Sequence, residues 1–292
     1  MAGNNPDTSH SFARRVAPFA PLALALLMHS GASIKGKAPK PKPPAHAPAA
    51  GGGFVPACTA PHFPSDIPAS IDATDCGLDG NGGAEAAQND AKNNFCAADP
   101  ATPVTLAEMI DKQKKVQQDS SIPFGNTRSH PLTSKPGPAT DRAPLHALGE
   151  GSLVTLQGFV KIARQEGKES VNCGTHVANA DTNHDIHISI VESPSQEECA
   201  GVVVEMIPHH RPPSWNADNV QAVADDQLPV RVTGQLMFDS SHTPCINGVG
   251  GAGDPKRASL WEIHPVYKFE LCPQGNCSSE TAWIPLETWK KP

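Results

Sequence analysis

Apolar and polar residues alternate with a period of two in five runs of the C-terminal half of the chain. Alternation of this kind is typical of β-strands that turn one face toward a core. A helix-compatible run from Trp215 to Val223, with Ser214 as its expected cap, lies between the third and fourth runs. The five predicted strands are residues 153–163, 186–191, 202–207, 230–238 and 259–271.

The order strand, strand, strand, helix, strand, strand predicts a fold that is mainly β, a five-stranded OB-like Greek-key barrel over residues 150–272. Gly158 stands in the middle of the long first run. A glycine inside a strand marks a bend, a bulge or a close backbone approach, so we expect the first strand to bend there.

The N-terminal third does not show this alternation. Arg14 and Arg15 precede an uncharged apolar run and a small-residue stretch, so residues 1–34 are predicted to be a signal peptide or a membrane anchor. Residues 35–56 are rich in Lys, Pro, Ala and Gly, a composition typical of an extended solvated linker. The two segments together predict a disordered N-terminal tail.

Between the tail and the barrel, residues 57–149 are predicted to form a small helical and loop-rich segment. One helix-compatible run covers residues 84–94, and a second helix is expected up to Gln118. Thr105 and Glu108 have the spacing of a capping box at the start of that helix. Residues 273–292 form a C-terminal extension.

Charge and aromatic content disfavour nucleic acid as a partner. The formal net charge is −7, and residues 150–292 hold 10 Lys or Arg against 18 Asp or Glu. This acidic excess repels a polyanion. A single Tyr and few other aromatic residues leave few platforms for base stacking.

The eight cysteines favour export to an oxidising compartment, where disulfides form. We expect Cys272 to pair with Cys277, because the PQGN loop between them lets the side chains meet. Cys76 with Cys96 is the next pair, and Cys173 and Cys199 flank the second strand, where a bond between them would staple its ends. The partners of Cys58, Cys173, Cys199 and Cys245 stay open at this point.

The segments VNCG, DIHISIVES, VVVEMIPHHRPPSWN, PVRVTGQLMFDSSH and SLWEIHPVYKFEL resemble a group of uncharacterised bacterial exported proteins with a predicted OB-like domain. The resemblance covers residues 150–272. It implies the fold and an exported location, either periplasmic, secreted or membrane-tethered. It implies no activity, because none is established for the group.

Three predicted strands carry polar residues that point toward metal chemistry. His187, Glu205 and His264 form a His/Glu/His set suited to a divalent metal with open coordination positions. Asp185 shares a face with His187, and Glu262 with His264, so each is a candidate additional ligand or general base. We expect this polar face to line a groove or meet solvent. The alternative is that these side chains only satisfy one another and nearby backbone groups.

The loop after the third strand adds His209, His210 and Arg211, candidate binding residues for an anionic ligand. The alternative for this proline-rich segment is a stiff turn without a ligand. The chain lacks the GxSxG, HExxH, phosphate-loop and dinucleotide-binding motifs, which excludes hydrolase, kinase and dehydrogenase assignments based on them.

The sequence therefore favours an exported, disulfide-stabilised binding or interaction module of the cell envelope. Its ligand or protein partner is unknown, and the membrane is contacted only through the N-terminal segment. The alternative is a metal-dependent hydrolase, with phosphoesters as one substrate class, that uses the His/Glu/His cluster. The cofactor in that alternative is a divalent metal.

Overall fold

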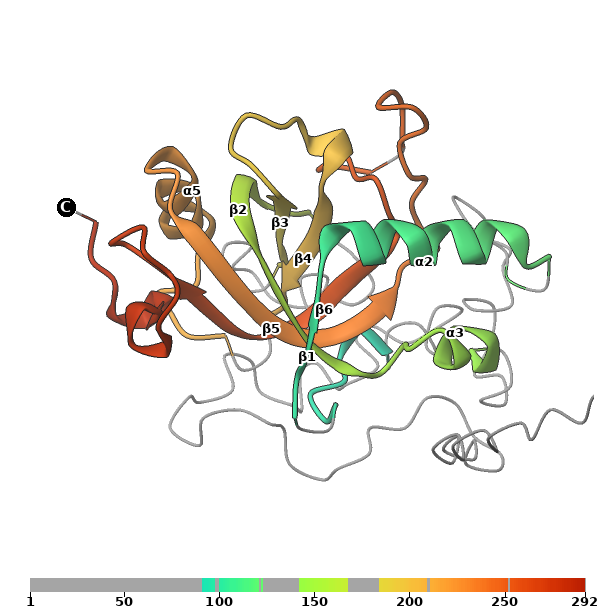
Figure 1. Ribbon diagram of the computed structural model, residues 1–292, viewed down its shortest axis with the longest axis horizontal. Helices are drawn as coiled ribbons and strands as arrows, with labels where there is room; N and C mark the ends of the chain where they lie inside the picture. Colours follow the sequence, from blue (N-terminus) through green and yellow to red (C-terminus); the bar gives the residue numbers. More distant parts are fainter. Residues whose placement is uncertain are drawn as a thin grey trace, which may run out of the picture. The chain divides into compact units, whose positions relative to one another are not determined.

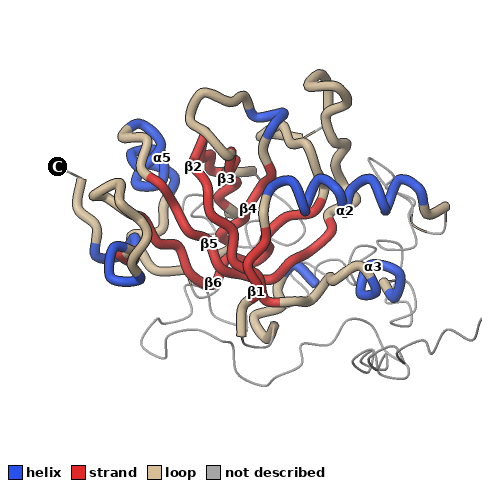
Figure 2. Tube along the Cα trace, in the orientation of Figure 1, coloured by secondary structure: helices blue, strands red, loops and turns tan. Residues whose placement is uncertain are grey.

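The computed structural model describes residues 91–97, 100–120, 122, 142–167, 184–208, 211–251 and 253–291. The predicted signal peptide or anchor (1–34), the linker (35–56) and most of the helix-compatible run 84–94 lie outside these residues. The structure is mainly β, with few helices (Figures 1 and 2). The strands are β1 Thr102–Val104, β2 Leu153–Gln165, β3 Ile186–Val191, β4 Val202–Met206, β5 Pro229–Phe238, β6 Trp261–Leu271 and β7 Ile284–Pro285.

Five of the strands close into a barrel. β3 lies between β2 and β4, β4 pairs with β6, β6 pairs with β5, and β5 pairs back to β2. The β4–β6 pairing is parallel, and the other four are antiparallel. β1 adds to β2 in parallel, and β7 pairs with β6.

β2 takes part in both closing edges because it changes partner along its length. Its first half pairs with β5 and its second half with β3, and Phe159 is the residue where the two pairings meet. A Cβ atom on Gly158 would lie 2.6 Å from the carbonyl oxygen of Val191. The strand therefore needs glycine at the point where it leaves one neighbour for the other, as its sequence predicts.

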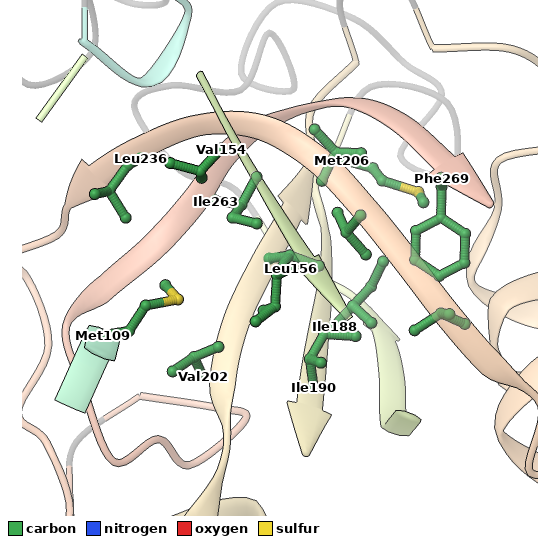
Figure 3. Close-up of a cluster of buried hydrophobic side chains, with 14 of the residues drawn as sticks. Met109, Val154, Leu156, Ile188, Ile190, Val202, Met206, Leu236, Ile263 and Phe269 are labelled. Atoms are coloured by element: carbon green, nitrogen blue, oxygen red, sulfur yellow. The ribbon is translucent and has the colours of Figure 1, made fainter. Parts of the chain in front are cut away.

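The barrel interior is apolar (Figure 3). Side chains such as Leu156, Ile188 and Ile263 are fully buried in one cluster, to which β2, β3, β4, β5 and β6 all contribute. Full burial of an aliphatic side chain contributes roughly 1.5–3 kcal/mol. This cluster is the main source of stability in the described part of the chain.

Helix α2 (Leu106–Gln118) packs on this interior through an amphipathic face that includes Leu106, Met109 and Val116. Its start is set by the capping box that the sequence predicts. Thr105 Oγ1 accepts from the backbone N–H of Glu108, and Glu108 Oε2 accepts from the backbone N–H of Thr105. The short α3 (Ala143–Ala147) lies in the segment that the sequence predicts to be helical and loop-rich.

Helix α5 (Ala217–Asp225) lies next to β2 and places Val220 and Val223 in the core (Figure 1). It begins two residues later than predicted. Asn216, rather than Ser214, is the cap, because its side-chain oxygen accepts from the backbone N–H of Asn219. The described residues also include the short 3-10 helices η4 Glu198–Ala200, η5 Glu280–Ala282 and η6 Leu286–Thr288.

Disulfides tie two surface segments to the barrel. Cys272 and Cys277 are bonded, as the sequence predicts. Cys199 pairs with Cys245, so the predicted staple between Cys173 and Cys199 is wrong. The loop after β5 returns to η4 and brings Cys245 to Cys199, a contact between distant segments that local spacing did not reveal.

Cys96 is also disulfide-bonded. Its expected partner Cys76 lies outside the described residues, as does Cys173. The disulfides indicate an oxidising environment. None of the helices in the described ranges has the length and apolar character that crossing a membrane requires.

Candidate metal centre

Strand pairing brings the three predicted metal ligands together. β3 and β4 pair with His187 opposite Glu205. β4 and β6 run in parallel with Val204 opposite Ile263, and Glu205 and His264 are the next residues along their strands. The parallel pairing thus places β6 directly beside β4, which the alternation of each strand could not establish.

The three side chains meet at one oxygen atom. His187 Nε2 lies 3.3 Å from Glu205 Oε2, and His264 Nε2 lies 2.7 Å from the same oxygen. All three residues are at most 1% exposed. The prediction that this polar face meets a groove or solvent is wrong, because the face is buried and Lys92 and Asp254, from outside the barrel strands, contact it.

Each imidazole is held by a backbone carbonyl on its other side. His264 Nδ1 lies 2.8 Å from the carbonyl oxygen of Lys92, and His187 Nδ1 lies 3.3 Å from that of Asp254. A carbonyl only accepts, so Nδ1 carries the proton in both rings and donates it. In a neutral imidazole the Nε2 atom is then a bare acceptor. Each Nε2 atom lies beside the Glu205 carboxylate, so with neutral rings the three side chains form a donor set suited to a cation.

Two more carboxyl groups flank this set. One ligand atom each from Asp185, His187 and Glu205 lies within 4.8 Å of the other two, and the same holds for Glu205, Glu262 and His264. Asp185 Oδ2 is 4.0 Å from His187 Nε2. Both residues that the sequence marks as extra ligands or bases therefore border the centre.

Glu262 is held at one oxygen only. Its Oε2 atom accepts from Arg257 Nη1 at 3.0 Å, and both side chains are fully buried. Its Oε1 atom is buried and has no hydrogen-bond partner in the part of the chain that the structure describes. A buried carboxylate oxygen of this kind is available as a metal ligand.

A second group of charged residues, which the sequence did not predict, lies beside the candidate metal centre. Lys92 Nζ lies 2.9 Å from Asp239 Oδ2, and His242 Nε2 lies 3.5 Å from the same oxygen. Asp239 and Lys92 are both buried. The polar run DSSH directly after β5 was a signal for Asp239 and His242, whereas no pattern links Lys92 to a strand more than a hundred residues away.

The surroundings set the ionisation of the central groups. Burial by itself raises the pKa of Glu205, but the neighbouring His187, Lys92 and His264 outweigh it and hold that pKa well below its ordinary value. Burial also lowers the pKa of His264, against the opposing effect of Glu205. The surroundings therefore favour the ionised form of Glu205 and the neutral form of His264.

The pKa values of the flanking groups are shifted as well. Burial and the nearby Glu205 and Asp239 raise the pKa of Glu262 well above its ordinary value. For Asp239, burial acts upward, but Lys92 and His242 lower its pKa. Burial and Arg257 lower the pKa of His242 to about 3.

Of the predicted anion-binding loop, only Arg211 belongs to the described residues; His209 and His210 do not. Arg211 is buried rather than presented to solvent. Its Nη1 atom donates to the carbonyl oxygens of His184, at 2.7 Å, and Met206, at 3.0 Å. Burial lowers its pKa to about 10, with Asp185 acting in the opposite direction.

The donor set fits a transition metal ion. Two neutral imidazole nitrogens and a carboxylate oxygen are ligands that zinc prefers, whereas calcium and magnesium prefer sites built from oxygen alone. Comparison of the chain with protein-family models, with curated proteins and with solved structures finds no match. The function therefore has to be argued from the geometry of this centre.

Proposed function

We propose that the chain is an exported, disulfide-stabilised module with an OB-like barrel that binds one divalent transition-metal ion through His187, Glu205 and His264. The strand order and the helix between β4 and β5 support the OB-like assignment. The disulfides and the predicted N-terminal leader support export. At the cell envelope, the metal-loaded barrel serves as a binding module.

One observation carries the metal proposal. Two imidazole Nε2 atoms lie 3.3 and 2.7 Å from the same carboxylate oxygen, and the Nδ1 atom of each ring is engaged by a backbone carbonyl. Histidines that bind metals characteristically donate their other N–H to a carbonyl or carboxylate, which fixes the tautomer and the ring orientation. A single divalent ion satisfies both lone pairs and the carboxylate at once.

The test is metal binding by the full chain. The metal content of the purified protein is measured, and zinc is titrated into chelator-treated protein by calorimetry. We expect one ion per chain, with saturable binding. The variants His187→Ala and His264→Ala are expected to lose more than the roughly 10–100-fold in affinity that changes outside the ligand set typically cause. Zinc at about 100 times its dissociation constant should stabilise the wild type by about 2.7 kcal/mol.

The exposed His146 of α3 supplies the matched control, because His146→Ala removes an imidazole far along the chain from the three ligands. This variant should bind zinc as the wild type does. Zinc binding that is absent, or that falls equally in His146→Ala and His264→Ala, overturns the proposal.

A metal-dependent hydrolase is the second candidate, favoured by the position of Asp185 and Glu262 beside a three-ligand set, since catalytic zinc sites keep a coordination position open. Burial of the whole set favours binding over turnover. Hydrolysis of a simple phosphodiester by the zinc-loaded protein, abolished in Glu262→Gln with zinc still bound, would decide for the enzyme.

A further inference from the structure

Both carbonyls that hold the imidazoles come from outside the barrel strands. The carbonyl of Lys92 belongs to residues 91–97, and that of Asp254 belongs to the loop 239–257. We call the described residues of these two segments the cap. The cap therefore controls the tautomer and orientation of both histidines without supplying a ligand atom.

The first part of the cap is fixed to the barrel by Gln235 of β5, which is fully buried. Gln235 Nε2 donates to the carbonyl oxygens of Ala91, at 2.6 Å, and His264, at 2.7 Å. Its Oε1 atom accepts from Asn94 Nδ2. Tyr267 adds a hydrogen bond from its hydroxyl to the carbonyl oxygen of Asn94. One side chain thus joins residues 91–97 to the backbone of a proposed ligand.

The second part of the cap is fixed to η4 and β2. Cys245 is bonded to Cys199, and the backbone N–H of Lys256 donates to Glu198 Oε2 at 2.8 Å. Asp254 forms an ion pair with Arg164 of β2.

The two parts of the cap also contact each other. Lys92 Nζ lies 2.9 Å from Asp239 Oδ2, and this ion pair is buried. A shift in either part is therefore transmitted to both histidines.

We propose that the cap is the outer shell of the metal centre, with Gln235 as its positioning residue and the Cys199–Cys245 disulfide as its anchor. The proposal rests on the proposed function, because it concerns the same centre. An imidazole released from its carbonyl rotates and changes tautomer, so fewer molecules present both Nε2 atoms to the ion at one time. Metal affinity consequently depends on residues that never touch the metal, and on the oxidised state of a disulfide.

The first test is Gln235→Met in the full chain, which keeps the side-chain length and removes the amide. We expect cobalt(II) and zinc to bind about 10–100-fold more weakly, the range typical of changes to groups that orient metal ligands. The visible absorption spectrum of bound cobalt should also change, because it reports ligand geometry, which a loss of stability alone does not alter. Thr233→Val is the matched control, since it removes the Thr155–Thr233 hydrogen bond from the same strand.

The second test removes the anchor. Cys199→Ser/Cys245→Ser should weaken cobalt binding by a factor in the same range and change the cobalt spectrum. Cys272→Ser/Cys277→Ser removes a disulfide of which neither cysteine lies in the cap. It should leave metal affinity and spectrum at their wild-type values. Circular dichroism establishes that each variant is folded. If Gln235→Met does not fold, the comparison of the two double-cysteine variants tests the cap proposal.

The outcomes separate the two proposals. If wild-type protein binds cobalt and both the Gln235 and the Cys199/Cys245 variants bind it equally well with an unchanged spectrum, the cap proposal is overturned and the metal centre stands. Equal weakening in the Cys272/Cys277 control also overturns it, since the effect would then be general. Wild-type protein that binds no cobalt or zinc overturns the proposed function, and the cap proposal with it.

Discussion

The strands β3, β4 and β6 have two faces that are equally buried and chemically opposite. Ile188 and Ile263 point into the barrel, where they belong to one cluster of buried apolar side chains (Figure 3). His187, Glu205 and His264 lie on the other face, at most 1% exposed, under the cap. Burial alone thus does not distinguish the core of this protein from its candidate site.

The difference lies in what burial costs on each face. Removing an aliphatic side chain from water is favourable by itself. A buried ionised group loses its hydration and has to be compensated by partners of good geometry. The apolar face therefore stabilises the fold, whereas the polar face needs the cap and, in our proposal, an ion. A cluster this costly favours a role in function over a role in stability.

The largest effect on stability is expected at Glu205, on the polar face. In chelator-treated protein, Glu205→Leu should lower the free energy of unfolding by about 3–5 kcal/mol, because it removes one of the carboxylates that compensate the charge of the buried Lys92. Replacing His187, Glu205 and His264 together by Leu should instead leave stability unchanged or raise it by about 1–4 kcal/mol, since no polar group of the triad remains. Urea denaturation measures both.

A triple variant that is less stable than Glu205→Leu would show that the polar face contributes to the fold as the core does. Neither variant keeps all three proposed ligands, so both should bind zinc more weakly than the wild type does, which a zinc titration measures.

The apolar face is tested by Ile188→Ala. We expect a loss of about 2–5 kcal/mol in the free energy of unfolding, because the side chain is fully buried and its removal leaves a cavity. Zinc affinity should stay at the wild-type value in the folded variant, since Ile188 lies on the face opposite the centre. A large change in zinc affinity would mean that the two faces are coupled.

The smallest effect is expected in an ion-pair network that reaches the surface, where Lys268 and Glu280 are exposed. Glu270 of β6 accepts from Arg231 Nε at 2.8 Å and from Arg231 Nη2 at 3.1 Å. Burial acts to raise the pKa of Glu270, but hydrogen bonds from Arg231 and Lys268 lower it overall. Glu270→Gln should therefore cost no more than about 1 kcal/mol near neutral pH.

The direction of the pKa shift determines how the contribution of Glu270 to stability depends on pH. A carboxyl whose pKa is depressed in the folded state stabilises the protein above its unfolded pKa of about 4.3, and this stabilisation is lost as the pH falls through the folded-state pKa. The stability difference between wild type and Glu270→Gln should shrink in acid. Glu280→Gln, at the exposed partner of the same Arg231, should have a smaller effect at every pH. A difference that grows on acidification contradicts the assignment.

Much of the barrel could be predicted because its elements are set by local patterns. Alternation located the five barrel strands, Gly158 marked the change of partner in β2, and Thr105 with Glu108 marked the start of α2. The close pair Cys272–Cys277 followed from its short loop. The distant pair Cys199–Cys245 did not, because spacing along the chain carries no information on which segments meet.

The sequence by itself determined which residues share a strand face, and hence that His187, Glu205 and His264 were candidates for one site. Only the tertiary structure decided that they meet, since the parallel pairing of β4 with β6 is a long-range contact. It also decided that the polar face is buried, because Lys92 and Asp254 reach it from segments far along the chain. Side-chain period is a property of each strand alone, whereas neighbours and coverage depend on how the whole chain closes.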